Sequence, residues 1–121
     1  MTKTPATLES LTERLIEFRD ARDWRQFHSL KDLIVSLNLE ASELLELTQW
    51  QTADDFDASI NTPKTKAALE EECADVLLYL LLIAERSGID ILAAASAKID
   101  KNAEKYPVEK ARGNARKYTE L

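Results

Sequence analysis

The chain has 121 residues, of which 45% are hydrophobic and 31% are charged, so one folded globular domain is expected rather than a disordered chain. The formal net charge of −6 argues against nonspecific binding to nucleic acid polymers or to anionic membranes. The single cysteine, Cys73, excludes an internal disulfide, and the polar N-terminus does not read as a signal peptide. We therefore expect a cytoplasmic protein.

Four helices are predicted in chain order, over about residues 5–22, 30–50, 63–88 and 91–106. Each would begin after a residue that can cap a helix N-terminus, and these residues are Thr4, Ser29, Thr62 and Asp90. Residues 51–62 are polar and acidic and predict a loop, and a basic tail follows from about residue 107 to residue 121. No alternating strand pattern appears, so the predicted fold is all-α, in a single domain over residues 1–121.

The longest apolar run, Val76–Ala84, lies in the third predicted helix. It is much shorter than the roughly 20 residues that span a bilayer. A helix that is apolar on nearly every side must be buried on nearly every side, and in a small chain this favours contact with a second copy. We therefore expect a four-helix bundle that is completed by oligomerisation, as a homodimer or a homotetramer.

Two of the predicted helices place acidic side chains within an apolar stripe. Because a helix advances about 100° per residue, Glu40 falls within roughly 60° of four leucines, which are Leu33, Leu37, Leu44 and Leu47. Glu43 lies about 60° to one side of Glu40, and Glu46 lies further toward the polar face. Glu72 and Asp75 repeat the arrangement of the first pair in the third helix. If the two stripes pack together, four carboxylates converge.

A buried carboxylate costs several kcal/mol unless it is paired or neutralised, and a bound cation removes that cost. A site made of carboxylates alone suits a hard ion, with Mg²⁺ first and Mn²⁺ second. A solvated or salt-bridged helix face is the alternative for each acidic pair. A di-iron site would need Glu-x-x-His on two helices, and the only histidine, His28, lies outside both pairs.

The motifs LEASE, which holds Glu40 and Glu43, and EECAD, which holds Glu72 and Asp75, resemble the metal motif of the MazG-like superfamily of all-α NTP pyrophosphohydrolases. Together with RDWRQFH and NAEKYP, they are most similar to the dCTP pyrophosphatases. The resemblance runs from about residue 18 to the C-terminus. In LEASE, alanine and serine stand where relatives often carry glycine and valine, and the first seventeen residues match nothing in the family.

The resemblance implies Mg²⁺-dependent hydrolysis of a nucleoside triphosphate to the monophosphate and pyrophosphate. It implies dCTP and its 5-modified forms as preferred substrates, in house-cleaning of the nucleotide pool, and active sites that are shared between subunits. The implied metal ligands are Glu40, Glu43, Glu72 and Asp75. The implied substrate contacts are Trp24, Phe27, His28, Trp50, Tyr79, Lys98, Asn102, Lys105 and Tyr106.

The residues support this chemistry, since a triphosphate can approach carboxylates only through a cation. Glu43 and Glu72 are the predicted catalytic residues, and Glu43 is our candidate for the base that activates water. The phosphates need cationic groups on the side opposite the carboxylates. Lys98, Asn102 and Lys105 share one face of the fourth predicted helix and are the candidates for these phosphate contacts. Lys105 and Arg116 are plausible phosphate ligands, although a solvated basic face would show the same pattern.

Trp24 and Phe27 lie in a predicted linker, where large aromatic side chains can stack on a nucleobase or close the core over helix ends. A different class of function also stays open. The chain would then be a non-catalytic helical regulator that binds a nucleotide or a protein partner, and a nucleotide would stabilise it without turnover.

Overall fold

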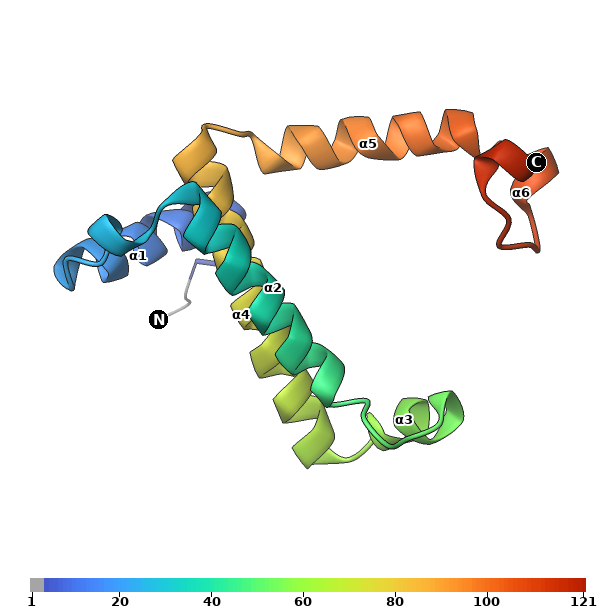
Figure 1. Cartoon of the computed structure of the whole chain (residues 1–121), viewed down its shortest axis with the longest axis horizontal. Coiled ribbons are helices and arrows are strands. Elements are labelled where there is room, and N and C mark those ends of the chain that lie inside the picture. Colours follow the sequence, from blue (N-terminus) through green and yellow to red (C-terminus); the bar gives the residue numbers. More distant parts are fainter. Residues whose placement is uncertain (1–3) are drawn as a thin grey trace. The chain divides into compact units, whose positions relative to one another are not determined.

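The computed structural model describes residues 4–121, and within that range it contains helices, turns and loops but no strand (Figure 1). The chain divides into two compact units, Met1–Gly88 and Ile89–Leu121. Helices α1 (Leu8–Ala21), α2 (Leu30–Glu46), α3 (Ala53–Ser59) and α4 (Pro63–Ser87) lie in the first unit, with a 3₁₀ turn η1 over Arg25–Phe27. The all-α prediction is confirmed, whereas the single-domain assignment for residues 1–121 stays a prediction.

In the first unit, α4 is the central helix, because α1 and α2 both pack on it. Figure 1 shows α2 and α4 running side by side along most of the length of α2. The buried apolar residues of the described chain lie on these two helices, and they are Leu33, Leu81, Leu82 and Ala84. Gly88 ends α4 in the left-handed conformation, with φ of 71°, as the sequence predicts.

The second unit holds α5 (Ile91–Lys105), α6 (Val108–Ala111) and a 3₁₀ turn η2 (Tyr118–Glu120). Asp90 caps α5 as predicted, since its Oδ1 accepts a hydrogen bond from the Ala93 backbone N–H at 3.1 Å. The C-terminal tail returns to the end of α5. There the Tyr118 ring meets the Tyr106 ring edge-on with centroids 6.1 Å apart, and Lys105 Nζ lies 4.8 Å from the Tyr118 ring centroid.

The predicted start of the first helix is wrong. We expected a cap at Thr4, but α1 begins at Leu8 and its N-cap is Thr7. Thr7 and Ser10 form a reciprocal capping box: the Ser10 backbone N–H donates to Thr7 Oγ1 at 3.0 Å, and the Thr7 backbone N–H donates to Ser10 Oγ at 2.8 Å. Two backbone donors at the start of α1 are satisfied in this way.

Two predictions around residue 50 are also wrong. Helix α2 ends at Glu46 rather than at Trp50, and residues 47–50 form a turn in which Trp50 has a φ of 65°. The predicted loop over residues 51–62 contains α3, because Thr52 Oγ1 caps the helix by accepting from the Asp55 N–H at 3.1 Å. Asp54 and Asp55 lie in its first turn, where the helix dipole favours negative charge.

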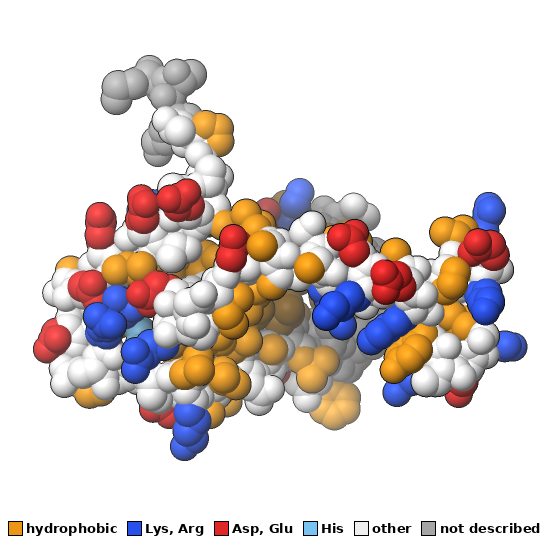
Figure 2. Space-filling view, turned by 90° about the horizontal axis from the view of Figure 1, so that it is seen from above, with side chains coloured by type: hydrophobic (Ala, Val, Ile, Leu, Met, Phe, Trp, Pro, Cys, Tyr) orange, Lys and Arg blue, Asp and Glu red, His pale blue; other side chains and the backbone are white. Residues whose placement is uncertain are grey.

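Many apolar side chains of the described residues are exposed, and the face in Figure 2 shows broad hydrophobic areas. On α2 and just after it, Leu39 is 59% exposed, Leu45 is 68% exposed and Trp50 is 94% exposed. In the apolar run of α4, residues outside the buried set are half-buried rather than fully enclosed. None of the helices in residues 4–121 is both long enough and apolar enough to span a membrane.

Candidate active site

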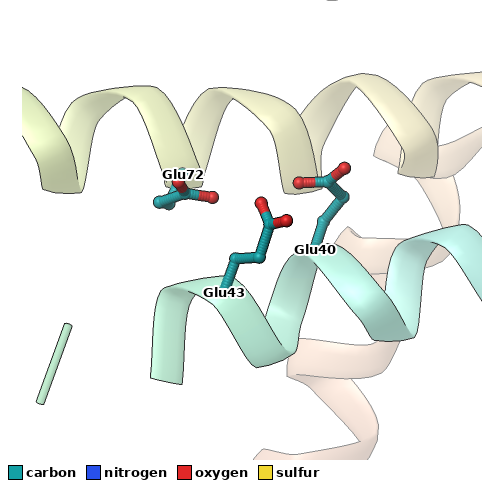
Figure 3. Close-up of side chains that lie close together, drawn as sticks. All are labelled: Glu40, Glu43 and Glu72. Atoms are coloured by element: carbon teal, nitrogen blue, oxygen red, sulfur yellow. The ribbon is translucent and has the colours of Figure 1, made fainter. Parts of the chain in front are cut away.

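Three acidic side chains from two helices point toward one another in the space between α2 and α4 (Figure 3). Glu40 and Glu43 extend from α2, and Glu72 extends from α4. One carboxylate oxygen from each residue lies within 4.8 Å of the other two. The structure therefore brings together three of the four predicted metal ligands.

Glu40 and Glu72 are half-buried, and both lack a full set of hydrogen-bond partners. Burial raises the pKa of Glu40, and a hydrogen bond with Glu43 and the nearby negative charges raise it further. Burial also raises the pKa of Glu72, with the charge of Glu43 next in importance. One oxygen of each, Oε2, is buried without a hydrogen-bond partner in the described part of the chain. The cluster therefore holds carboxylate oxygens that residues 4–121 leave unsatisfied.

Asp75, the fourth predicted ligand, lies one turn after Glu72 on α4 but outside this group of three. Its negative charge contributes to the raised pKa of both Glu40 and Glu72. Asp75 also lines the cavity next to the cluster. It thus links the acidic cluster to that cavity, and its role as a metal ligand stays a prediction.

The donor set fits a hard divalent cation. All candidate ligand atoms are carboxylate oxygens, which is the chemistry that Mg²⁺, Ca²⁺ and Mn²⁺ prefer. Two buried oxygens without partners are costly unless a proton or a cation satisfies them. His28 is not part of the cluster, so the histidine-containing ligand set of a di-iron centre is absent from the metal groupings of residues 4–121.

A cavity of about 270 Å³ opens between α1, α4 and the two residues that flank η1, Trp24 and His28. Three predicted substrate-binding residues, Trp24, His28 and Tyr79, line it together with Asp75. The remaining lining residues are Leu15, Phe18, Arg19, Leu78 and Leu82. An apolar and aromatic wall with a few polar groups is typical of a pocket for a ring-shaped ligand.

His28 is a polar residue of this pocket, and the described residues leave part of its hydrogen-bonding capacity unused. Its Nδ1 is buried and has no partner among the described residues. Burial lowers the pKa of His28, and the positive charge of Arg19 lowers it further. A neutral imidazole has one donor and one acceptor nitrogen, so His28 can recognise either kind of group on a ligand.

The aromatic wall is itself ordered by ring contacts. Phe18 and Trp24 meet edge-on with centroids 5.7 Å apart. The Arg22 guanidinium carbon lies 3.6 Å from the Phe18 ring centroid and 5.9 Å from the Trp24 ring. These contacts hold Trp24 beside the cavity although it is 44% exposed.

The other predicted substrate residues are not part of this cavity. Phe27 is 65% exposed in η1, and the exposed Trp50 follows α2. The remaining five belong to the second unit, on α5 or after it, and they are Lys98, Asn102, Lys105, Tyr106 and Arg116. Their relation to the acidic cluster stays a prediction.

The sequence prediction missed Arg19 and Phe18 as residues of the cavity. Arg19 carried a usable signal. It falls in the same α1 stripe as Leu8, Leu11 and Leu15, at spacings of three and four residues, just as Glu40 falls in the leucine stripe of α2. A charged residue in phase with an apolar stripe marks a buried charge in both helices. Phe18 carried no comparable signal, because aromatic residues are common on helix faces.

Comparison with known proteins identifies the family of the chain. The MazG-like family matches residues 35–121 of the chain. The chain is 43% identical over 115 residues to dCTP pyrophosphatase 1 of Mus musculus and to that of Homo sapiens, covering 95% of this chain and 68% of each relative. A pyrophosphatase structure from Archaeoglobus fulgidus matches with a TM-score of 0.78 and 38% identity, over 88% of this chain and 98% of that chain. The chain therefore belongs to the MazG-like family.

Proposed function

We propose that this protein is a nucleoside triphosphate pyrophosphohydrolase that converts dCTP, or a 5-modified dCTP, to the monophosphate and pyrophosphate. One observation supports the proposal most strongly: three carboxylates converge from α2 and α4 beside a cavity lined by Trp24, His28 and Tyr79. The relatives named dCTP pyrophosphatase 1 support the same substrate class. Removal of dCTP-like nucleotides from the nucleotide pool is the corresponding cellular role.

Glu40, Glu43 and Glu72, with Asp75 beside them, would hold a divalent cation, Mg²⁺ first and Mn²⁺ second. Such a cation neutralises phosphate charge and lowers the pKa of a bound water. The support for this assignment is chemical, since a cation would satisfy the buried oxygens of Glu40 and Glu72 that lack partners. A triphosphate and this carboxylate cluster are both negatively charged, so a cation between them would make their association favourable.

Glu43 is the proposed base that takes a proton from the attacking water. Unlike Glu40 and Glu72, Glu43 is exposed, so its carboxylate can reach solvent while it stays in the cluster. Glu72 is the second proposed catalytic residue, because it reaches the cluster from α4, opposite Glu40 and Glu43 of α2.

The cavity beside Asp75 would hold the base and sugar of the nucleotide. The Trp24 ring offers a stacking surface, and base–aromatic stacking contributes roughly 1–3 kcal/mol per base. The free Nδ1 of His28 can bond the edge of a base. Tyr79 lies one turn beyond Asp75 on the same helix, so the cavity and the acidic cluster share α4.

We further propose that the working form is a homodimer or a homotetramer. Trp50, Leu39 and Leu45 are largely exposed, and a second copy of the chain would cover them. In such an assembly, the basic face of α5 would supply phosphate contacts from Lys98, Asn102 and Lys105, with Tyr106 and Arg116 beside them. The exposed Phe27 and Trp50 would then complete the aromatic wall around the nucleotide.

A panel of ribo- and deoxyribonucleoside triphosphates, including 5-methyl-dCTP, tests this function through kinetics and product identification with Mg²⁺ present. We expect dCMP and pyrophosphate from dCTP, rather than dCDP and phosphate. Glu72→Gln should abolish turnover. Glu70→Gln is the matched control, because Glu70 is exposed on the same helix and lies outside the cluster.

The same panel separates the enzyme from a nucleotide-binding regulator. A regulator would be stabilised by dCTP and would release no pyrophosphate from any triphosphate. That outcome would overturn the proposed function.

A further inference from the structure

Arg19 is the one charged residue that is fully buried among residues 4–121, with 3% of its surface exposed. Its Nη1 donates to Glu85 Oε2 on α4 at 3.1 Å, and its Nε donates to Asp20 Oδ1 at 2.9 Å. Burying a guanidinium is costly unless its donors are paired with good geometry, and here two carboxylates pair with them. The ion pair with Glu85 therefore ties the C-terminal end of α1 to α4.

The backbone of Arg19 holds the next segment of chain. Its carbonyl oxygen accepts hydrogen bonds from the Arg22 N–H at 3.2 Å and from the Trp24 N–H at 3.1 Å. Between them, Asp23 adopts a left-handed conformation with φ of 53°, which few residues other than glycine, asparagine and aspartate adopt readily. The turn that carries Trp24 into the cavity is thus built on the carbonyl group of Arg19.

Arg19 also lines the cavity with Trp24 and His28, and its charge acts on His28. Arg19, on α1, therefore connects two other parts of the pocket. Its side chain reaches α4, which carries Tyr79 and Asp75, and its carbonyl group reaches the turn with Trp24. If this link is broken, the two walls of the cavity can move apart.

We propose that Arg19 is a positioning residue for the cavity: its ion pair with Glu85 and its bond to the Trp24 N–H fix residues 22–28 against α4 before a nucleotide binds. This inference rests on the proposed function, because it takes the cavity to be the nucleotide site. A preformed pocket binds its ligand more tightly, since less conformational freedom is lost on binding. Arg19 then contributes to nucleotide affinity and little to the chemical step.

Arg19→Met tests this proposal, because methionine keeps much of the apolar stem and removes the charge. We expect the KM for dCTP to rise roughly 10–100-fold while kcat stays within about threefold, the pattern seen when binding of the ground state and of the transition state is weakened equally. Hydrogen exchange of the backbone amides in residues 22–28 should become faster, with the central turns of α2 and α4 unchanged. Arg19→Lys, which keeps the charge but not the planar fork, should recover part of both effects.

Arg14→Met is the matched control, because Arg14 is exposed on the same helix and does not line this cavity. It should change neither the KM nor the exchange of residues 22–28. If Arg19→Met does not fold, Glu85→Gln decides the question with the same two measurements, since it weakens the ion pair from the α4 side.

Three results would overturn the positioning role in a folded variant. A KM within twofold of the parent value would show that the link does not serve binding. A raised KM with unchanged exchange in residues 22–28 would show that Arg19 contacts the nucleotide directly. Faster exchange throughout the first unit with an unchanged KM would show a purely structural role. If the parent releases no pyrophosphate from any triphosphate, the proposed function fails, and the exchange measurement still decides whether Arg19 fixes the turn.

Discussion

Helix α4 meets a charged partner at two places, and the two places differ in what the chain supplies. Near its C-terminal end, Glu85 receives a hydrogen bond from the buried Arg19 of α1. In its N-terminal half, Glu72 faces two further glutamates, Glu40 and Glu43 of α2. The first site is a satisfied ion pair, and the second is a group of like charges with buried oxygens that have no partner in residues 4–121.

This difference separates a structural charge from a functional one. An ion pair within the chain can be complete in the folded protein, although its net contribution to stability is small. Burial raises the pKa values of Glu40 and Glu72, and repulsion between the like charges of the cluster raises them further. A cation bound among these carboxylates would remove the repulsion and satisfy the buried oxygens, so the cluster is a candidate functional site.

The largest expected effect comes from neutralising an acid in the cluster. Glu43→Gln keeps the size of the side chain but removes the charge and the base. We expect kcat for dCTP to fall on the order of 10²–10³-fold, similar to the loss of one electrostatic group in other active sites. Steady-state kinetics with Mg²⁺ present would measure the change.

Glu46→Gln is the control for that experiment, because Glu46 lies on α2 three residues after Glu43, is exposed and is outside the cluster. Its kcat should stay within twofold of the parent value. Equal losses in the two variants would remove the distinction between the cluster and an ordinary solvated helix face.

In metal-free protein, neutralising one acid should change the free energy of unfolding in opposite directions at the two charge sites. Glu85→Gln weakens the ion pair with Arg19 and should lower the free energy of unfolding by about 1–3 kcal/mol, less than for a fully buried pair because Glu85 is partly exposed. Glu40→Gln removes one of several repelling charges and should raise the free energy of unfolding. Chemical denaturation at pH 7 with a chelator present would measure both, and a loss of stability in Glu40→Gln would contradict the account.

A smaller effect concerns pH. The pKa of a buried, repelled carboxyl group is higher in the folded state than in the unfolded state, where it is about 4.3 for glutamate. Such a group stabilises the folded protein at a pH below its unfolded pKa. This stabilisation is lost as the pH rises through the pKa of the folded state. Metal-free parent protein should therefore lose stability relative to Glu40→Gln as pH rises from about 4 to 7. The comparison with this variant cancels the contribution of His28, whose lowered pKa acts in the opposite direction. A stability difference that does not change with pH would exclude the repulsion.

The sequence predicted the parts of the fold that depend on local signals. The caps at Ser29 and Asp90 and the glycine that ends α4 are found where expected, because each is a hydrogen bond or backbone preference within a few residues. The wrong start of α1 shows the limit of this approach. Thr4–Pro5 and Thr7–Ser10 are both acceptable starts, and the reciprocal bonds of the second decide between them.

Helix phase also predicted the meeting of Glu40, Glu43 and Glu72, since apolar stripes pack against each other and carry any acid within them. It could not show that Asp75 would lie beside the cavity rather than within the group, because that depends on the crossing of two helices. It could have identified Arg19 by the same rule. Its partner Glu85 lies 66 positions away, and local patterns do not connect residues at that distance.

Direct measurement of metal binding tests the central claim, that the α2–α4 carboxylates are completed by a divalent cation. Metal-free protein would be titrated with Mn²⁺, and free Mn²⁺ would be counted by electron paramagnetic resonance. The account predicts saturable binding of equal affinity by the parent and by Glu70→Gln, and weaker binding by Glu72→Gln, because this variant loses one carboxylate ligand. Equal Mn²⁺ affinity in all three proteins would contradict it.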